Sequence, residues 1–86
     1  MQTATATLTK KLLIGNLPDH TQTSAVKEVF SVVGRVISVA VVSNGFAFVE
    51  MTAEDADRAR QKLNGYRFNG NALIIDDAYP PRHSRP

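Results

Sequence analysis

The sequence predicts an α+β fold in which four strands and two helices follow one another in the order βαββαβ. Three observations lead to this prediction. Four short segments are strand-like, because they are rich in β-branched residues or carry apolar side chains on one face. Two other segments carry apolar residues at helical spacing. Pro, Asn and Gly residues separate the segments and mark turns.

The first strand is expected at residues 11–16, where Leu12 and Ile14 share one face and Leu13 points to the other. A first helix is expected from about Thr23. Four apolar residues then recur at i, i+3, i+4 and i+7, which is the spacing of one helical face: Val26, Val29, Phe30 and Val33.

Gly34 follows this helix at the position of a left-handed C-terminal cap, so we expect it to adopt that conformation. The β-branched run at residues 36–42 predicts a second strand. Residues 44–51 predict a third strand, because small and large side chains alternate along them.

A second helix is expected to begin at Thr52 or Ala53, and its acidic first turn suits the positive N-terminal dipole. The helix should end at residues 64–65, an Asn-Gly pair. Another Asn-Gly pair at residues 69–70 predicts a turn, and residues 72–77 predict the fourth strand.

The third strand divides its side chains unequally. One face is wholly apolar and carries Ala47, Val49 and Met51. The other face carries Phe46, Phe48 and Glu50, and burying it would leave the Glu50 carboxylate without an evident partner, at a high cost. From this strand alone, two interpretations stay open. Either the two aromatic rings are exposed, or the strand is buried on both faces with Glu50 at its frayed end.

The order of the elements favours exposed rings. A crossover between parallel strands is right-handed, so both helices should cover the same face of the sheet. The apolar side of each strand then packs on the helices. Leu13, Phe46 and Phe48 are therefore expected on the open face, where paired aromatic rings can stack on nucleobases.

The length of the loop between the second and third strands can be predicted from which side chains each length would bury. A two-residue turn at residues 44–45 would expose two valines that a three-residue loop at residues 43–45 buries: Val39 and Val41. We therefore expect the longer loop, with Gly45 left-handed and Ala40 opposite Phe48.

Composition excludes several classes of site. The chain of 86 residues is long enough for one small domain, and it contains no cysteine for a disulfide or thiolate metal site. With only two histidines and no long apolar run, we expect no metal, no cofactor and no membrane span. The net charge of +2 permits a polyanionic partner without requiring one. We expect a disordered lead-in at residues 1–9, one domain at residues 10–79 and a basic, proline-rich tail at residues 80–86.

Three segments, in order and correctly spaced, resemble the RNA recognition motif family over residues 10–79. They are Leu12-Leu13-Ile14-Gly15-Asn16-Leu17 with the following Pro18, residues 44–51, and residues 54–65 of the second helix and its exit. The resemblance implies a ferredoxin-like sandwich, with a four-stranded antiparallel sheet and two helices on one face. It also implies binding of single-stranded RNA across the open face, and no enzymatic activity.

The family's residue roles carry over position by position. Phe46 and Phe48 match its two exposed aromatic residues. Leu13 stands where the family usually has a third ring, and Asn44 stands where it prefers Lys or Arg. Because stacking is worth roughly 1–3 kcal/mol per base, the missing ring predicts a modest affinity.

Five further residues complete the expected RNA-binding set: Lys11, Glu50, Asp76, Tyr79 and Arg82. Lys11 supplies positive charge at the start of the first strand. Glu50 and Asp76 can accept from bases, although Glu50 can equally be a solvated edge residue and Asp76 can weaken binding. Tyr79 either replaces the missing ring or caps the domain, and Arg82 either contacts phosphate or belongs to an ordinary linker.

Three candidate functions remain. The first is binding of single-stranded RNA by a monomer that acts inside the cell, in the nucleus or the cytoplasm. The second is a protein-interaction module that binds other protein domains. The third is an enzyme resembling acylphosphatases, which would need an arginine-bearing phosphate cradle after the first strand. Residues 17–20 offer none, so RNA is expected first, protein second and catalysis last.

Overall fold

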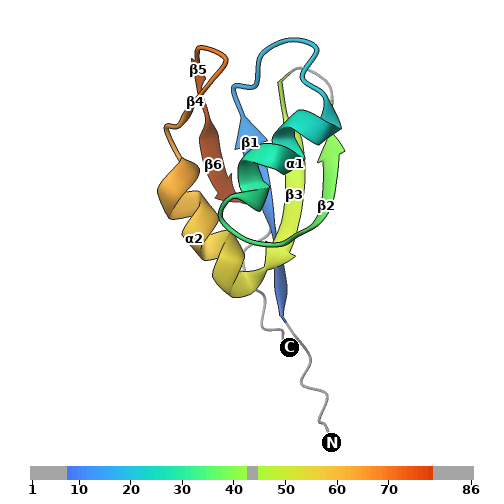
Figure 1. The fold of residues 1–86 in the computed structure, drawn as a ribbon, viewed down its shortest axis with the longest axis vertical. Coiled ribbons are helices and arrows are strands. Elements are labelled where there is room, and N and C mark those ends of the chain that lie inside the picture. The colour runs from blue at the N-terminus through green and yellow to red at the C-terminus, as the bar shows by residue number, and fades with distance from the viewer. Residues whose placement is uncertain (1–7, 43–44, 79–86) are drawn as a thin grey trace, which may run out of the picture.

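The computed structural model describes residues 8–42 and 45–78 (Figure 1). Both helices lie on one face of a four-stranded sheet, and the predicted α+β class and βαββαβ order are confirmed. The elements are β1 (Thr9–Gly15), α1 (Thr23–Ser31), β2 (Val36–Val41), β3 (Ala47–Thr52), α2 (Ala53–Leu63), β4 (Arg67–Phe68), β5 (Asn71–Ala72) and β6 (Ile74–Asp77).

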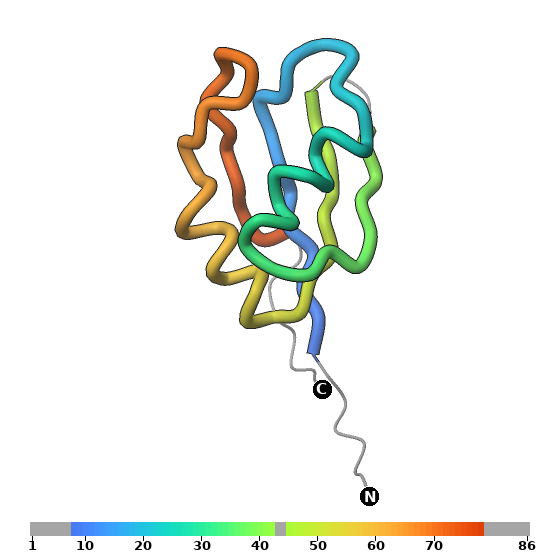
Figure 2. Tube along the Cα trace, in the orientation of Figure 1, coloured from blue at the N-terminus to red at the C-terminus, as the bar shows by residue number. Residues whose placement is uncertain are grey.

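The sheet has the strand order β2-β3-β1-β6, and every neighbouring pair is antiparallel. β1 therefore lies in the interior of the sheet although it comes first in the chain, as the trace in Figure 2 shows. Its first residue is Thr9, two residues before the predicted start. The carbonyl of Leu8 accepts a hydrogen bond from the amide of Ala53 at 2.8 Å, which holds the start of β1 beside α2.

The core forms between the sheet and the two helices. As expected, it consists of the apolar side chains on one face of the strands and on the facing sides of the two helices. The least exposed large side chains are Phe30, Leu12, Ile14, Met51, Val26 and Val49. The face predicted to be core in β3 is thus fully buried, and the face with the two phenylalanines is left to the solvent side.

The predicted three-residue connection between β2 and β3 is confirmed by its register. Ala40 lies opposite Phe48, and the amide of Val42 donates to the carbonyl of Phe46 at 2.8 Å. Gly45 has φ +81, the left-handed conformation that this loop requires. A register shift between Val36 and Ser38 was not predicted, and it leaves Ile37 49% exposed on the edge strand.

The expected left-handed cap at Gly34 is wrong. α1 ends at Ser31 with a right-handed Val32 cap, and Gly34 is not among the residues with positive φ. The glycine is instead required by space, because a Cβ atom there would lie 2.5 Å from Cγ of Asp55. That carboxylate accepts from the amide of Arg35 at 3.3 Å and from Arg58 at 2.8 Å, so it ties the α1–β2 connection to α2.

The predicted fourth strand at residues 72–77 is divided in the structure. Asn69 and Gly70, with φ of 50 and 92, form the predicted turn and close a short β4–β5 hairpin. Only β6 joins the large sheet, where it pairs with β1. The second helix begins as expected, since the Thr52 side chain accepts from the amide of Asp55 at its N-terminus.

Candidate nucleic-acid interface

The open face of the sheet, on the side away from the helices, carries most of the predicted site residues in rows across the strands. The central row runs from Ala40 on β2 through Phe48 on β3 and Leu13 on β1 to Asp76 on β6. Directly opposite residues in neighbouring strands have Cβ atoms about 4.5–5.5 Å apart. Leu13 therefore lies between an aromatic ring and a carboxylate, as the alternation of side chains predicted.

The next row contains Phe46, which is 45% exposed and lies over Gly15. Its Cε1 atom is 3.3 Å from the position that a Cβ atom on Gly15 would occupy. Ile74 pairs with Gly15 from β6 and is 61% exposed beside the ring. We call Phe46, Phe48 and Leu13 the stacking platform. It offers two rings and one aliphatic side chain to a ligand.

Ile74 was not among the predicted site residues. The signal that could have found it is the alternation that placed Asp76, since residues 74 and 76 share a face when 73 and 75 are buried. It extends the apolar surface of the platform from β1 to the edge of the sheet.

Glu50 lies beside the platform with both carboxylate oxygens occupied. Its Oε2 accepts from the Thr9 hydroxyl at 2.9 Å and its Oε1 from the Ser38 hydroxyl at 3.3 Å. Lys11 is exposed directly opposite on β1. The structure thus brings Lys11 and Glu50 together at one end of the open face, and it fixes the Glu50 carboxylate between two neighbouring strands.

The other lysine of β1 lies on the helix side. Lys10 has the same parity as Leu12, and its side chain is 16% exposed. Its ammonium lies 2.6 Å from Oδ1 of Asp57 on α2 and 3.5 Å from Oδ1 of Asp77 on β6. Arg60 approaches the same Asp77 oxygen at 3.7 Å. Asp77 and Lys10 therefore belong to an ion cluster behind the sheet, whereas Asp76 remains on the open face.

The ion pair between Lys10 and Asp57 shifts the pKa values of both residues. The hydrogen bond from Lys10 lowers the pKa of the Asp57 carboxyl from its ordinary value near 3.8. The same hydrogen bond raises the pKa of Lys10 above 10.5, with desolvation of the partly buried ammonium opposing the shift. Both charges are kept over the physiological range, and the pair joins the first strand to the second helix.

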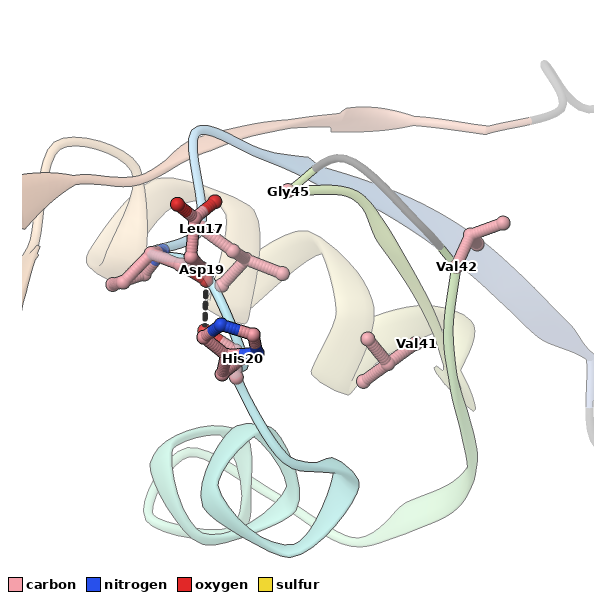
Figure 3. A pocket seen from close by; sticks show the side chains of 8 residues that line it. Leu17, Asp19, His20, Val41, Val42 and Gly45 are labelled. Carbon is pink, nitrogen blue, oxygen red and sulfur yellow. Dashed lines mark hydrogen bonds between the residues drawn. The ribbon is translucent and has the colours of Figure 1, made fainter.

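A pocket of about 300 Å³ lies at the end of the sheet between the β1–α1 loop and the β2–β3 hairpin (Figure 3). Asp19 and His20 line it from the loop, and Val41 and Val42 line it from β2. The amide of Leu17 donates to the carbonyl of Gly45 at 3.0 Å, which holds the two loops together. Neither phenylalanine of the stacking platform is among the described residues that line the pocket, so it is separate from that surface.

Two predicted site residues, Tyr79 and Arg82, lie outside the described residues, and so does Asn44. Their predicted roles stay predictions. The six others are described, and all of them lie on the open face: Lys11, Leu13, Phe46, Phe48, Glu50 and Asp76.

Comparison with known proteins decides the family. The sequence profile of the RNA recognition motif matches residues 12–74, which run from the middle of β1, through both helices, β2 and β3, to the first residue of β6. This chain belongs to the RNA recognition motif family. The match contains the whole stacking platform, so the resemblance predicted from three short segments is confirmed.

Relatives of this RNA recognition motif include plant and animal proteins. It is 37% identical over 79 residues to the 29 kDa ribonucleoprotein A, chloroplastic, of Nicotiana sylvestris. The matched residues make up 83% of this chain and 29% of that protein. It is 38% identical over 84 residues to RNA-binding protein CP31B, chloroplastic, of Arabidopsis thaliana, covering 88% and 29%. It is 33% identical over 75 residues to the human RNA binding protein fox-1 homolog 3, covering 80% and 24%. The chain therefore spans less than a third of the length of these relatives.

Solved structures agree on the fold. The third RNA recognition motif domain of Mip6 superposes with a TM-score of 0.77 at 27% identity, covering 80% of this chain and 93% of that domain. RNA recognition domains 1 and 2 of Drosophila melanogaster Sex-lethal give a TM-score of 0.77 at 23% identity, covering 83% and 50%. In the part described here, neither helix has the length and hydropathy needed to span a bilayer. No group of three metal-ligating side chains occurs among residues 8–42 and 45–78.

Proposed function

We propose that this RNA recognition motif binds single-stranded RNA across its open face, with bases stacked on Phe46 and Phe48. The observation that carries the proposal is the position of these rings on the solvent side of a sheet whose other face is buried. Base–aromatic stacking contributes roughly 1–3 kcal/mol per base and needs only an accessible ring face. Membership of the family and the names of its relatives, a ribonucleoprotein and two RNA-binding proteins, support the same ligand.

We expect the affinity of the isolated domain to be modest. The central position of the platform is Leu13, which offers apolar contact without a ring. Among the described residues of the open face, Lys11 is the one cation, and it lies directly opposite the Glu50 carboxylate. Few phosphates can then be neutralised, so counterion release should contribute little and the salt dependence should be shallow.

The expected residues Tyr79 and Arg82 belong to this proposal. The amide of Ala78 donates to the carbonyl of Lys11 at 2.9 Å, so the last described residue lies beside β1. An RNA strand that crosses the platform toward β6 would pass the point where the chain continues to these two residues.

We also propose that the unit acts as a monomeric binding module without catalytic activity. Its boundaries are residues 10–79, and it acts in the nucleus or the cytoplasm. Two of the relatives above are named as chloroplastic, so a plastid is a third compartment to test.

A titration followed by NMR tests the proposal. Short single-stranded RNA oligonucleotides are added to the isotopically labelled chain, and amide and aromatic shifts are mapped. Shifts concentrated on Leu13, Phe46 and Phe48 support RNA binding by the open face. Shifts that avoid the sheet and gather on the helices, for example at Lys27 and Arg58, would contradict it and favour the protein-interaction alternative.

A further inference from the structure

The Asp76 carboxylate has an unused oxygen at the edge of the stacking platform. Its Oδ1 accepts from the amide of Asp77 at 2.9 Å, which orients the side chain. Among the described residues, no donor reaches Oδ2. Asp76 is exposed, and it lies directly opposite Leu13 on the open face. A flat ligand resting on Leu13 would meet this carboxylate at its edge.

Glu50, the other carboxylate of the open face, already accepts a hydrogen bond on each oxygen. Both of its oxygens accept hydroxyl hydrogen bonds, from Thr9 and from Ser38. Each Glu50 oxygen therefore keeps at most one acceptor site for a base, whereas Oδ2 of Asp76 has no donor among the described residues and can accept from a base without any neighbouring bond. The two carboxylates therefore differ in what they can do, although the sequence alone gives them the same role.

An ionised carboxylate beside a polyanion has consequences for what can lie there. It repels phosphate, so the RNA backbone should pass elsewhere and a base edge should face Asp76. It only accepts hydrogen bonds, so the edge that faces it must donate. Two parallel hydrogen bonds to one carboxylate are stronger and more specific than one, as arginine–carboxylate pairs demonstrate.

The four bases differ in the donors that they offer. Guanine has N1–H and the N2 amine side by side, which match both oxygens of a carboxylate, since Oδ1 keeps a second lone pair. Adenine and cytosine each have one amine next to a ring nitrogen that accepts. Uracil has a single N3–H between two carbonyl oxygens, which face the carboxylate with like charge. Guanine is thus the best partner and uracil the worst.

We propose that Asp76 makes the position over Leu13 selective for guanine in single-stranded RNA. The proposal rests on the RNA-binding function proposed above and adds to it the base that one position prefers. Phe48 lies on the other side of Leu13 and holds the base by stacking, while Asp76 reads its edge. Each good bidentate contact to a base gives about 1–3 kcal/mol of discrimination, which corresponds to roughly ten- to hundredfold in affinity.

The test compares four RNA hexamers: six uridines, and the same hexamer with one internal guanosine, adenosine or cytidine. Their dissociation constants are measured by fluorescence anisotropy for the wild-type chain and for Asp76→Asn. The Asn side chain keeps an oxygen that can accept from the Asp77 amide, but it turns one acceptor into a donor. Glu28→Gln, an exposed carboxylate on α1, is the matched control for loss of one negative charge.

The expected result is at least about tenfold tighter binding of the guanosine hexamer than of hexauridine. The preference should fall below about threefold in Asp76→Asn and persist in Glu28→Gln. The inference is overturned if wild type binds all four hexamers alike, if the preference survives Asp76→Asn, or if Asp76→Asn tightens all four equally. In those cases RNA binding itself still stands. A folded wild type that binds no hexamer would overturn the proposed function and this inference with it.

Discussion

The ring of Phe46 lies directly over Gly15, with Cε1 3.3 Å from the place where a Cβ atom would begin. This exposed ring, one residue before β3, is thus supported by a residue of β1 that has no side chain. Ile74 borders the same space from β6, with its Cβ atom 3.9 Å from that position. The ring therefore lies close to the sheet beside β1 and β6, and Gly15 of β1 leaves room for it because glycine has no side chain.

Replacing Gly15 should therefore weaken RNA binding more than it weakens the fold. Gly15 has no positive φ, so its backbone accepts a side chain. Gly15→Ala requires the ring to move by a few tenths of an ångström, while the branched side chain of Gly15→Val should displace it. We expect a small loss of affinity for Ala and roughly a tenfold loss for Val, because about one stacking contact is lost. Anisotropy gives the affinity, and thermal unfolding monitors the fold. Equal affinity of Gly15→Val and wild type would contradict this role of the ring.

Leu13→Phe should tighten RNA binding. The new ring would lie between Phe48 and Asp76 and complete a three-ring platform. We expect roughly a tenfold gain for one added stacked base. Leu13→Met, which changes the side chain without adding a ring, is the matched control and should leave the affinity unchanged. A Phe variant that is folded and binds like wild type would mean that no base rests on the first strand.

Gly34→Ala should destabilise the domain through Asp55. The added methyl would lie 2.5 Å from Cγ of that carboxylate, which must then give up its bonds to the Arg35 amide and Arg58. We expect a loss of about 1–2 kcal/mol in the free energy of unfolding, measured by denaturant titration. The same substitution in an Asp55→Ala background should cost clearly less, because the clash is absent. Equal costs in the two backgrounds would place the cause in the backbone of Gly34.

The Lys10–Asp57 ion pair should give stability that depends on pH. Since the folded pKa of Asp57 is lowered, its contribution is present above about 3.8 and is lost as pH falls through the folded value. Since the folded pKa of Lys10 is raised, its contribution is present below 10.5 and is lost as pH rises through the folded value. Asp57 is half exposed, so solvent should keep the total below about 1 kcal/mol.

The measurement is the difference in unfolding free energy between wild type and Asp57→Asn from pH 3 to pH 11. We expect the difference to be largest in the middle of this range and to shrink at both ends, with RNA affinity at neutral pH unchanged because the pair lies behind the sheet. Glu54→Gln, in the first turn of the same helix, controls for loss of a carboxylate near the helix dipole. A difference that does not vary with pH would show that the pair contributes nothing measurable.

Alternation, together with the right-handed crossovers that place both helices on one face, was sufficient to predict the platform. Burying Glu50 with Phe46 and Phe48 would be costly, so the opposite side of β3 was the better core face, and it is buried. The same parity chose the longer hairpin loop and thereby the pairing of Ala40 with Phe48. These predictions succeeded because successive side chains of a strand point to opposite faces, so the face of each residue follows from its position along the strand.

Features that depend on how elements dock could not be predicted in this way. The local sequence predicts a helix cap at Gly34. Glycine is instead required there because Asp55, 21 positions further along the chain, leaves no space for a side chain once the protein has folded. Lys10 is adjacent to Lys11 in the sequence, yet it has the parity of Leu12 and lies behind the sheet. Its partners on α2 and β6 are known only from the packed structure. The hydroxyl contacts of Glu50 likewise needed the register of three strands.

The central claim is tested most directly by the affinity of the Phe46→Ala, Phe48→Ala double variant for single-stranded RNA, measured by anisotropy beside wild type. Val32→Ala, which truncates an 86% exposed apolar side chain just after α1, is the matched control. We predict that the double variant remains folded and loses at least about tenfold in affinity, while the control binds like wild type. A folded double variant that binds RNA as tightly as wild type would contradict recognition by the open face.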